Sequence, residues 1–169
     1  GRLQHVVVAS RALAPMLRFY EDDLGFVVSD YVVDAAAGGE RTVGFFRSSP
    51  EHHSFAVFRC PETRPDHQAF ETTCWNDIRD WADHMATLNI KLWWGPGRHG
   101  IGHNLFTYHR APNGLITELF AQLDQMNEEL GYFEPRPWHR DRPQKPKVWA
   151  KDPTAANYWG IMPTDEMHK

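Results

Sequence analysis

The fold is decided by residues 3–26, which read LQHVVVASRALAPMLRFYEDDLGF. Its first part is an apolar run around His5 and predicts a short β-strand at residues 4–8. Its second part predicts a helix, because Pro15 suits a first helical turn and Gly25 suits the left-handed conformation that ends a helix. The apolar residues between them recur at helical spacing: Leu13, Met16, Leu17, Tyr20 and Leu24.

The same pattern occurs a second time at residues 67–89, HQAFETTCWNDIRDWADHMATLN. A strand at residues 67–72 precedes a helix with nearly the same apolar stripe, for which Asn76 is a plausible N-cap and Asn89 a C-terminal stop. Three further strands are predicted after each helix, separated by turn residues. They are residues 26–33, 42–46 and 54–58 in the first copy, and 90–94, 104–108 and 115–120 in the second.

The repeat predicts an α+β fold of two βαβββ modules, paired into a curved mixed β-sheet that encloses a metal-holding cavity. We expect one catalytic domain at residues 1–124, with modules at about 1–60 and 65–124. Residues 125–169 contain many Pro, Arg, Lys and Trp residues and predict an extended arm, either docked on the surface or forming a flap over the active site or a partner subunit. Because the chain enters a strand almost at once, we also expect that an N-terminal segment or domain precedes it.

Composition excludes several classes of protein. With 169 residues, 41% hydrophobic and 13% aromatic, the chain is globular rather than disordered. A formal net charge of −4 argues against a nucleic-acid partner, and no apolar run approaches the roughly 20 residues of a membrane helix. Cys60 and Cys74 form no C-x-x-C pair and are expected as free thiols, which with the lack of a leader peptide predicts a cytoplasmic protein.

Three side chains on predicted strands point to a metal site: His5, His67 and Glu118. Two imidazoles and one carboxylate hold Fe(II) on one face and leave the other face open for substrate and dioxygen. A lone histidine on a strand is more often an ordinary packed residue than a metal ligand. A carboxylate inside a buried strand, however, needs a partner that offsets the cost of burying its charge, and a metal ion is one of the few such partners. The matching strand of the first module, residues 54–58, offers no good ligand, so one corner of a pseudo-symmetric site would stay vacant.

Several motifs resemble those of the extradiol ring-cleaving dioxygenases, a group within the vicinal oxygen chelate superfamily. One comprises residues 97–99 (GRH), Tyr108, residues 111–114 (APNG) and Glu118; the others are residues 51–56 (EHHSFA) and 19–26 (FYEDDLGF). Thr107 departs from the pattern, since the family usually has an apolar residue before the tyrosine, and family members usually carry a second domain of similar fold.

The resemblance implies cleavage of a catechol ring by O2 at Fe(II), with Mn(II) accepting the same donors, in the catabolism of aromatic compounds. It implies His5, His67 and Glu118 as metal ligands, His53 as the acid–base group, and His99 and Tyr108 as hydrogen-bond donors to a bound oxygen. It also favours a homo-oligomer. His52 should point to the opposite face of the strand from His53, with two alternatives: His52 is the inward residue, or both are exposed.

The other histidines carry weaker expectations. His109 should face away from Tyr108, His84 should be solvated, and His103 could reach the pocket or lie in a loop. His139 and His168 are expected on the surface of the arm.

Two other functions stay open. A glyoxalase-type isomerase or epimerase has the same fold but normally fills all four metal corners. A bleomycin-resistance-type binding protein holds no metal and lacks the ligand triad.

Overall fold

The computed structural model describes residues 1–127, 132–134, 147–160 and 162. They fall into two compact units. Unit 1 contains residues 1–4, 67–123 and the described residues after 152; unit 2 contains residues 5–66 and the described residues between 124 and 152. His139, His168 and much of the predicted arm lie outside the described residues.

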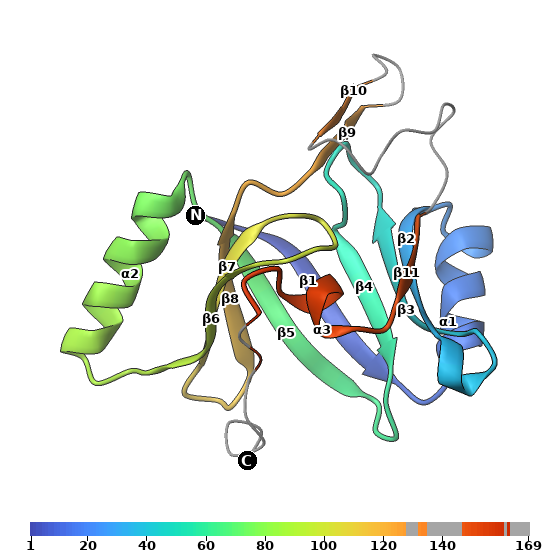
Figure 1. The fold of residues 1–169 in the computed structure, drawn as a ribbon, viewed down its shortest axis with the longest axis horizontal. Helices are drawn as coiled ribbons and strands as arrows, with labels where there is room; N and C mark the ends of the chain where they lie inside the picture. Colours follow the sequence, from blue (N-terminus) through green and yellow to red (C-terminus); the bar gives the residue numbers. More distant parts are fainter. Residues whose placement is uncertain (128–131, 135–146, 161, 163–169) are drawn as a thin grey trace. The chain divides into compact units, whose positions relative to one another are not determined.

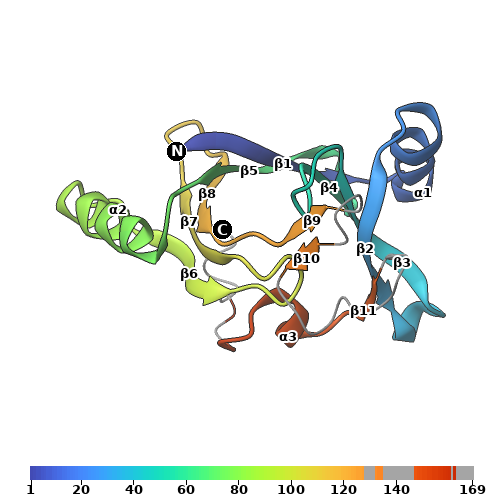
Figure 2. The same ribbon diagram turned by 90° about the horizontal axis from the view of Figure 1, so that it is seen from above.

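The first module runs in the predicted order of strand, helix and three strands (Figure 1). In unit 2, β1 pairs with β4 in parallel, β4 with β3 and β3 with β2 in antiparallel fashion. The helix packs against β3 and β4, which gives the sheet one covered face (Figure 2). The elements are β1 (Arg2–Ser10), α1 (Leu13–Arg18), η1 (Phe19–Asp23), β2 (Val27–Asp34), η2 (Ala35–Ala37), β3 (Glu40–Arg47) and β4 (Phe55–Arg59).

The second module repeats this topology in unit 1. Strand β5 pairs with β8 in parallel, β8 with β7 and β7 with β6 in antiparallel fashion, so the order β5-β8-β7-β6 matches β1-β4-β3-β2. The α+β class and the two βαβββ modules are therefore confirmed. The elements are β5 (Arg64–Glu71), α2 (Trp75–Thr87), β6 (Leu92–Arg98), β7 (Leu105–Arg110) and β8 (Ile116–Ala121).

The first helix differs from its prediction. The α-helical part ends at Arg18, and a π-helical turn, η1, continues to Asp23, with the Leu24 amide donating to the carbonyl of Phe19. Tyr20 in this wider turn stacks on Phe55, with ring centroids 4.1 Å apart, and packs on the core of unit 2. Gly25 adopts the predicted left-handed conformation, with φ of 69°.

The second helix also differs at its start. Its N-cap is Cys74 rather than Asn76, because the Asp77 carboxylate in the first turn accepts a hydrogen bond from the Thr73 amide at 2.8 Å. Asn89 ends the helix with a φ of 56°, as predicted. The apolar stripe is only partly buried: Ile78 and Met85 are in the core, whereas Trp81 is 50% exposed.

The segments after residue 124 are distributed over both units. In unit 2, β9 (Gln125–Asn127) pairs with β10 (Tyr132–Glu134), and β11 (Lys147–Ala150) extends the sheet as a parallel neighbour of β2 (Figure 1, Figure 2). In unit 1, the short helix α3 (Pro153–Ala156) precedes Asn157, whose buried side chain accepts hydrogen bonds from the amides of Arg98 and Trp159. Part of the predicted arm is thus docked, while the division into a domain at 1–124 and an arm at 125–169 stays a prediction.

Two smaller expectations concern cysteines and membranes. Cys60 and Cys74 are both free thiols, as expected. Within the described part of the chain, none of the helices has the length and apolar character needed to cross a bilayer.

Candidate active site

The site in unit 1 is built around Glu118, in the middle of β8. All six residues of this strand are buried, because β8 lies between β5 and β7, and Glu118 itself is 1% exposed. Its Oε1 accepts a hydrogen bond of 2.9 Å from the side-chain amide of Asn104. Its Oε2 lies 3.4 Å from Nε2 of His67. A carboxylate this deeply buried is stable only because polar groups surround both of its oxygens.

His67 begins the paired part of β5, two residues before the position opposite Glu118. Two donors that bind one ion at about 2.0–2.2 Å each lie about 3 Å apart when they subtend a right angle at the ion. The separation of His67 Nε2 and Glu118 Oε2 is close to that value, and an imidazole and a carboxylate suit a divalent metal such as Fe(II) or Mn(II). This pair therefore fits a metal.

Tyr108 and His99 lie beside this pair. Tyr108 is directly opposite Glu118 in the β7–β8 register, and its ring meets the His67 ring edge-on with centroids 5.2 Å apart. Nε2 of His99 lies 3.1 Å from the Tyr108 hydroxyl and 3.6 Å from Oε1 of Glu118. The His99 ring stacks on Phe106 at 3.9 Å.

The proton on His99 is placed by its other nitrogen. Nδ1 lies 2.5 Å from the carbonyl oxygen of Ala156 in α3, and a carbonyl only accepts hydrogen bonds, so Nδ1 carries the hydrogen. In the neutral ring Nε2 is then an acceptor, and the hydroxyl of Tyr108 donates to it. The C-terminal helix α3 thus orients a candidate site residue.

The site residues in unit 2 are His5 and His53. His5 lies on β1 with 2% of its surface exposed, and His53 lies in the loop between β3 and β4 with 5% exposed. Their ring centroids are 4.4 Å apart. The ring of Phe45 packs edge-on against the ring of His53, with centroids 5.2 Å apart.

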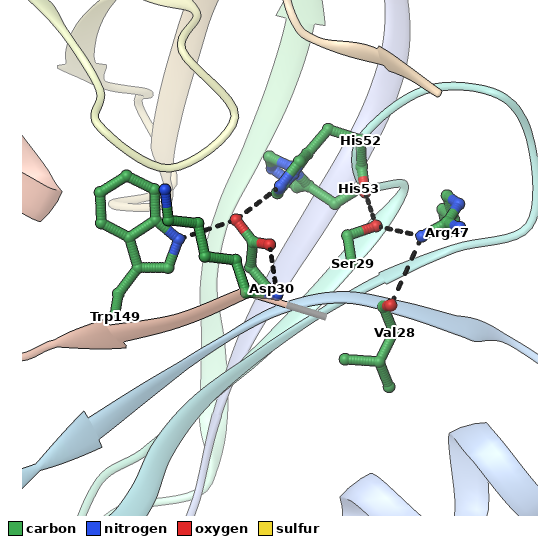
Figure 3. A network of polar contacts seen from close by, with 8 residues as sticks. Val28, Ser29, Asp30, Arg47, His52, His53 and Trp149 are labelled. Atoms are coloured by element: carbon green, nitrogen blue, oxygen red, sulfur yellow. Dashed lines mark hydrogen bonds and ion pairs between the residues drawn. The ribbon is translucent and has the colours of Figure 1, made fainter. Parts of the chain in front are cut away.

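The expectation for His52 is wrong. Residues 52–54 are not part of a strand, so the alternation of side chains between two faces does not apply to them. His52 is fully buried, and its Nδ1 lies 2.9 Å from Nδ1 of His53, while its Nε2 lies 3.1 Å from Oδ2 of Asp30 on β2 (Figure 3). Both histidines are therefore interior residues of one hydrogen-bonded chain.

The remaining histidines lie outside these groups. His84 is exposed on α2, as expected. His103 lies in a loop with a φ of 55°, and burial together with the nearby Arg98 guanidinium lowers the pKa of His103 to about 4. Burial also lowers the pKa of His109, which lines a hollow beside α2 with Met85.

Asn104 in unit 1 and Asp30 in unit 2 are two further residues of interest that the sequence did not indicate. Both are fully buried and contact a predicted site residue or its neighbour: Asn104 donates to Glu118, and Asp30 accepts from His52. Asn104 is the first residue of a predicted strand, and Asp30 lies within a predicted apolar strand. A polar residue at such a position is the sequence signal that could have identified both. A polar side chain that the pattern places in the core needs a polar partner.

A known protein family matches most of the chain. Residues 2–119 match the family model described as the Glyoxalase/Bleomycin resistance protein/Dioxygenase superfamily. The chain belongs to this superfamily. The matched span includes every residue proposed above as a metal ligand or catalytic group.

Three curated relatives with similar sequences are, by name, a metapyrocatechase and two dioxygenases. Metapyrocatechase 2 from Cupriavidus necator is 31% identical over 123 residues, which cover 73% of this chain and 37% of that protein. A manganese-dependent 2,3-dihydroxybiphenyl 1,2-dioxygenase from Geobacillus genomosp. 3 is 27% identical and covers 88% of this chain and 47% of the relative. An iron-dependent extradiol dioxygenase from Rhodococcus jostii is 27% identical, and the aligned region covers 94% of this chain and 50% of the relative. The chain therefore spans half or less of the length of these relatives.

Two solved structures of the superfamily have similar folds. Homoprotocatechuate 2,3-dioxygenase from Arthrobacter globiformis has a TM-score of 0.79 and 25% identity, over 98% of this chain and 48% of that one. A Mn(II)-bound glyoxalase from Novosphingobium aromaticivorans has the same TM-score and coverage, with 28% identity. The resemblance deduced from the sequence motifs is therefore confirmed at the level of superfamily and fold.

Proposed function

We propose that this chain forms the catalytic part of an extradiol dioxygenase, which cleaves a catechol ring with O2 at one divalent metal. His5, His67 and Glu118 are the proposed ligands. These residues form a group of side chains, found among the described residues, that could together hold a metal ion. The names of the sequence relatives support the reaction class, since they include a metapyrocatechase and two extradiol-type dioxygenases.

The observation that carries the proposal is the buried Glu118 with His67 beside it. The side-chain amide of Asn104 donates to one carboxylate oxygen, and the other oxygen faces the imidazole at a distance suited to a shared ion. His5 is the proposed third donor; it follows Gln4 directly, and Gln4 belongs to the same unit as His67 and Glu118. Fe(II) is the proposed metal, and Mn(II) is the alternative because both accept the same donors and relatives of each kind exist.

The strand register explains why three ligands are proposed rather than four. In the second module, the residue opposite Glu118 on β5 is Ala69, two positions after His67. In the first module, the residue two positions after His5 is Val7, and the residue opposite it on β4 is Ala56. Alanine has no donor atom, so the corner equivalent to Glu118 stays open to substrate and dioxygen.

The chain's own residues supply positioning and proton transfer. When bound, the metal would act as a Lewis acid and connect the catechol and dioxygen electronically. His53 would accept a proton from a substrate hydroxyl and later return it, because an imidazole titrates near neutral pH. On substrate binding, Tyr108 would transfer its hydrogen bond from Nε2 of His99 to a substrate oxygen. Aromatic side chains of unit 1, including Trp94 stacked on Tyr108, would pack against the ring.

Oxygen uptake tests the proposal directly. The protein is loaded with Fe(II) or Mn(II) without air, and a panel of catechols is added in an oxygen-electrode cell. We expect consumption of one O2 per catechol and a yellow ring-opened product. A metal-loaded protein that consumes no oxygen with any catechol would contradict the proposed reaction.

A glyoxalase-type isomerase is the second candidate, favoured by the similarity to the Mn(II)-bound glyoxalase. It would isomerise its substrate without consuming oxygen. Isomerase turnover by the metal-loaded protein, with no oxygen uptake on catechols, would establish this alternative. The open corner at Ala56 is the reason that ring cleavage is preferred.

A further inference from the structure

A buried chain of polar side chains leads from β2 to His53 in unit 2 (Figure 3). It begins at the carboxylate of Asp30, continues through the ring of His52 and ends at the ring of His53. The first two side chains are fully buried and His53 is 5% exposed. Asp30 Oδ2 lies 3.1 Å from His52 Nε2, and the two Nδ1 atoms lie 2.9 Å apart.

The carboxylate sets the direction of the hydrogen bonds. An ionised carboxylate only accepts, so the hydrogen of the Asp30–His52 contact sits on Nε2 of His52. In a neutral imidazole the other nitrogen then has a lone pair, and Nδ1 of His52 accepts. The hydrogen between the two Nδ1 atoms therefore belongs to His53, whose Nε2 keeps a lone pair.

The carboxylate of Asp30 is itself held by the C-terminal segment. The indole Nε1 of Trp149 donates to Oδ2 at 2.9 Å, and the backbone amide of Lys147 donates to Oδ1 at 3.2 Å. Both residues lie on β11, which pairs with β2 beside Asp30. Donors to both oxygens fix the plane of the carboxylate.

The backbone of the histidine pair is held as well. The Ser29 hydroxyl donates to the carbonyl of His52, and Arg47, 5% exposed, donates to the Ser29 oxygen at 2.8 Å. These contacts place His52 between Asp30 and His53 with little freedom to rotate.

We infer that Asp30 and His52 are positioning residues that fix His53 as the Nδ1–H tautomer, with Nε2 able to accept a proton. The catalytic value of this arrangement rests on the role of His53 in the proposed function. The tautomer itself does not, because it follows from hydrogen bonds inside unit 2. The segment containing Trp149 takes part in the arrangement, since it holds the carboxylate that starts the chain.

The opposite arrangement is chemically distinct. If His52 were an imidazolium, it would donate from Nδ1 to His53, and His53 would carry its hydrogen on Nε2. That form could not accept a proton at Nε2. The two arrangements differ in which nitrogen of His53 is protonated, and this is measurable.

Nitrogen NMR of the metal-free full chain, labelled with ¹⁵N at histidine, separates the two arrangements. The spectrum is recorded at a pH above the titration range of histidine. We expect a pyrrole-type shift for Nδ1 and a pyridine-type shift for Nε2 of His53, and the reverse for His52. A pyrrole-type Nε2 on His53 would overturn the inference.

Variants of His52 test whether it sets the tautomer. His52→Phe removes the acceptor for His53, so the His53 signals should move toward the Nε2–H tautomer. His52→Gln can donate its amide to Asp30 and accept with its oxygen from His53, so it should keep the native tautomer. Unchanged His53 signals in His52→Phe, or loss of the native tautomer in His52→Gln, would overturn the role of His52. If His52→Phe does not fold, the wild-type spectrum and His52→Gln still decide.

Asp34→Asn is the matched control. Asp34 also joins β2 to the C-terminal segment, through Lys151 at 3.2 Å, but it makes no contact with His52. Its variant should leave the His53 signals in place. A change equal to that of His52→Phe would show that loosening this segment, and not the loss of the acceptor, moves the tautomer.

Steady-state kinetics complete the test in the metal-loaded enzyme. We expect His52→Phe to lower kcat about 10- to 100-fold with little change in the KM for the catechol, and His52→Gln to recover most of the loss. An unchanged kcat in His52→Phe would overturn the positioning role. If the wild-type spectrum shows the expected tautomer and no catechol is turned over, the proposed function fails and the assigned tautomer stands.

Discussion

The side-chain amide of Asn104 donates to Oε1 of Glu118 over 2.9 Å, and both residues are only 1% exposed. This contact occupies one carboxylate oxygen and leaves the other directed at His67, 3.4 Å away. Groups that hydrogen-bond to a ligand fix its orientation and tune its basicity. Asn104 therefore supports the proposed metal site, although it is not itself a proposed ligand.

Asn104→Ala should weaken metal binding about 10- to 100-fold, because Glu118 loses the donor that orients it. Titration with Mn(II), followed by calorimetry, measures the Kd. Asn76→Ala is the control, since Asn76 lies exposed on α2 and contacts Arg79. Equal Kd values for both variants and the wild type would show that the Asn104 contact is irrelevant to the metal.

His53→Ala should keep the metal and the substrate but lower kcat about 10²-fold or more, as expected for the loss of a general acid–base group. Metal content and kcat are measured on the same sample. His84→Ala, which removes an exposed histidine from α2, should behave like wild type. Normal turnover by His53→Ala would rule out the assigned role.

Tyr108→Phe should retain the metal and lose about 10- to 100-fold in kcat, because the ring keeps its packing while the hydroxyl 3.1 Å from His99 is removed. The comparison requires kcat with a saturating catechol and the metal content of each sample. A variant that turns over at the wild-type rate would leave Tyr108 as a packing residue only.

His103 should make stability fall in mild acid. The pKa of His103 is lowered from 6.5 to about 4 in the folded chain, so between these values the unfolded chain binds a proton that the folded chain does not. The free energy of unfolding is unaffected by His103 above pH 6.5 and decreases progressively as the pH falls toward 4, because the unfolded chain takes up the proton there. His103→Asn keeps a residue that tolerates positive φ and removes the titrating group. Denaturant unfolding across this range should show a steeper loss for the wild type, and parallel curves would contradict the assignment.

The sequence predicted the modules because their signals are local. The periodicity of each helix, the strand order and the left-handed positions at Gly25 and Asn89 are all encoded within a few residues. Glu118 could be identified because a carboxylate in an otherwise apolar strand is conspicuous. The superfamily followed from short motifs around these residues.

The missed features depend on contacts between distant parts of the chain. The pairing of His52 with Asp30 joins residues 22 positions apart, and Trp149 reaches Asp30 across 119 positions. The orientation predicted for His52 is wrong because it assumes the side-chain alternation of a strand, whereas the backbone of residues 52–54 is irregular. The exposed Trp81 shows that helical periodicity does not reveal how completely a stripe is covered.

The proposed function depends first on one divalent ion bound by His5, His67 and Glu118. The decisive measurement is the number of metal ions per chain after anaerobic loading with Fe(II) or Mn(II) and removal of excess metal. It is made on the wild type and on His5→Ala, His67→Ala and Glu118→Gln. We expect one ion per chain in the wild type and none in each variant, with all four proteins folded by circular dichroism. A folded variant that retains one ion as tightly as the wild type would rule out this ligand set.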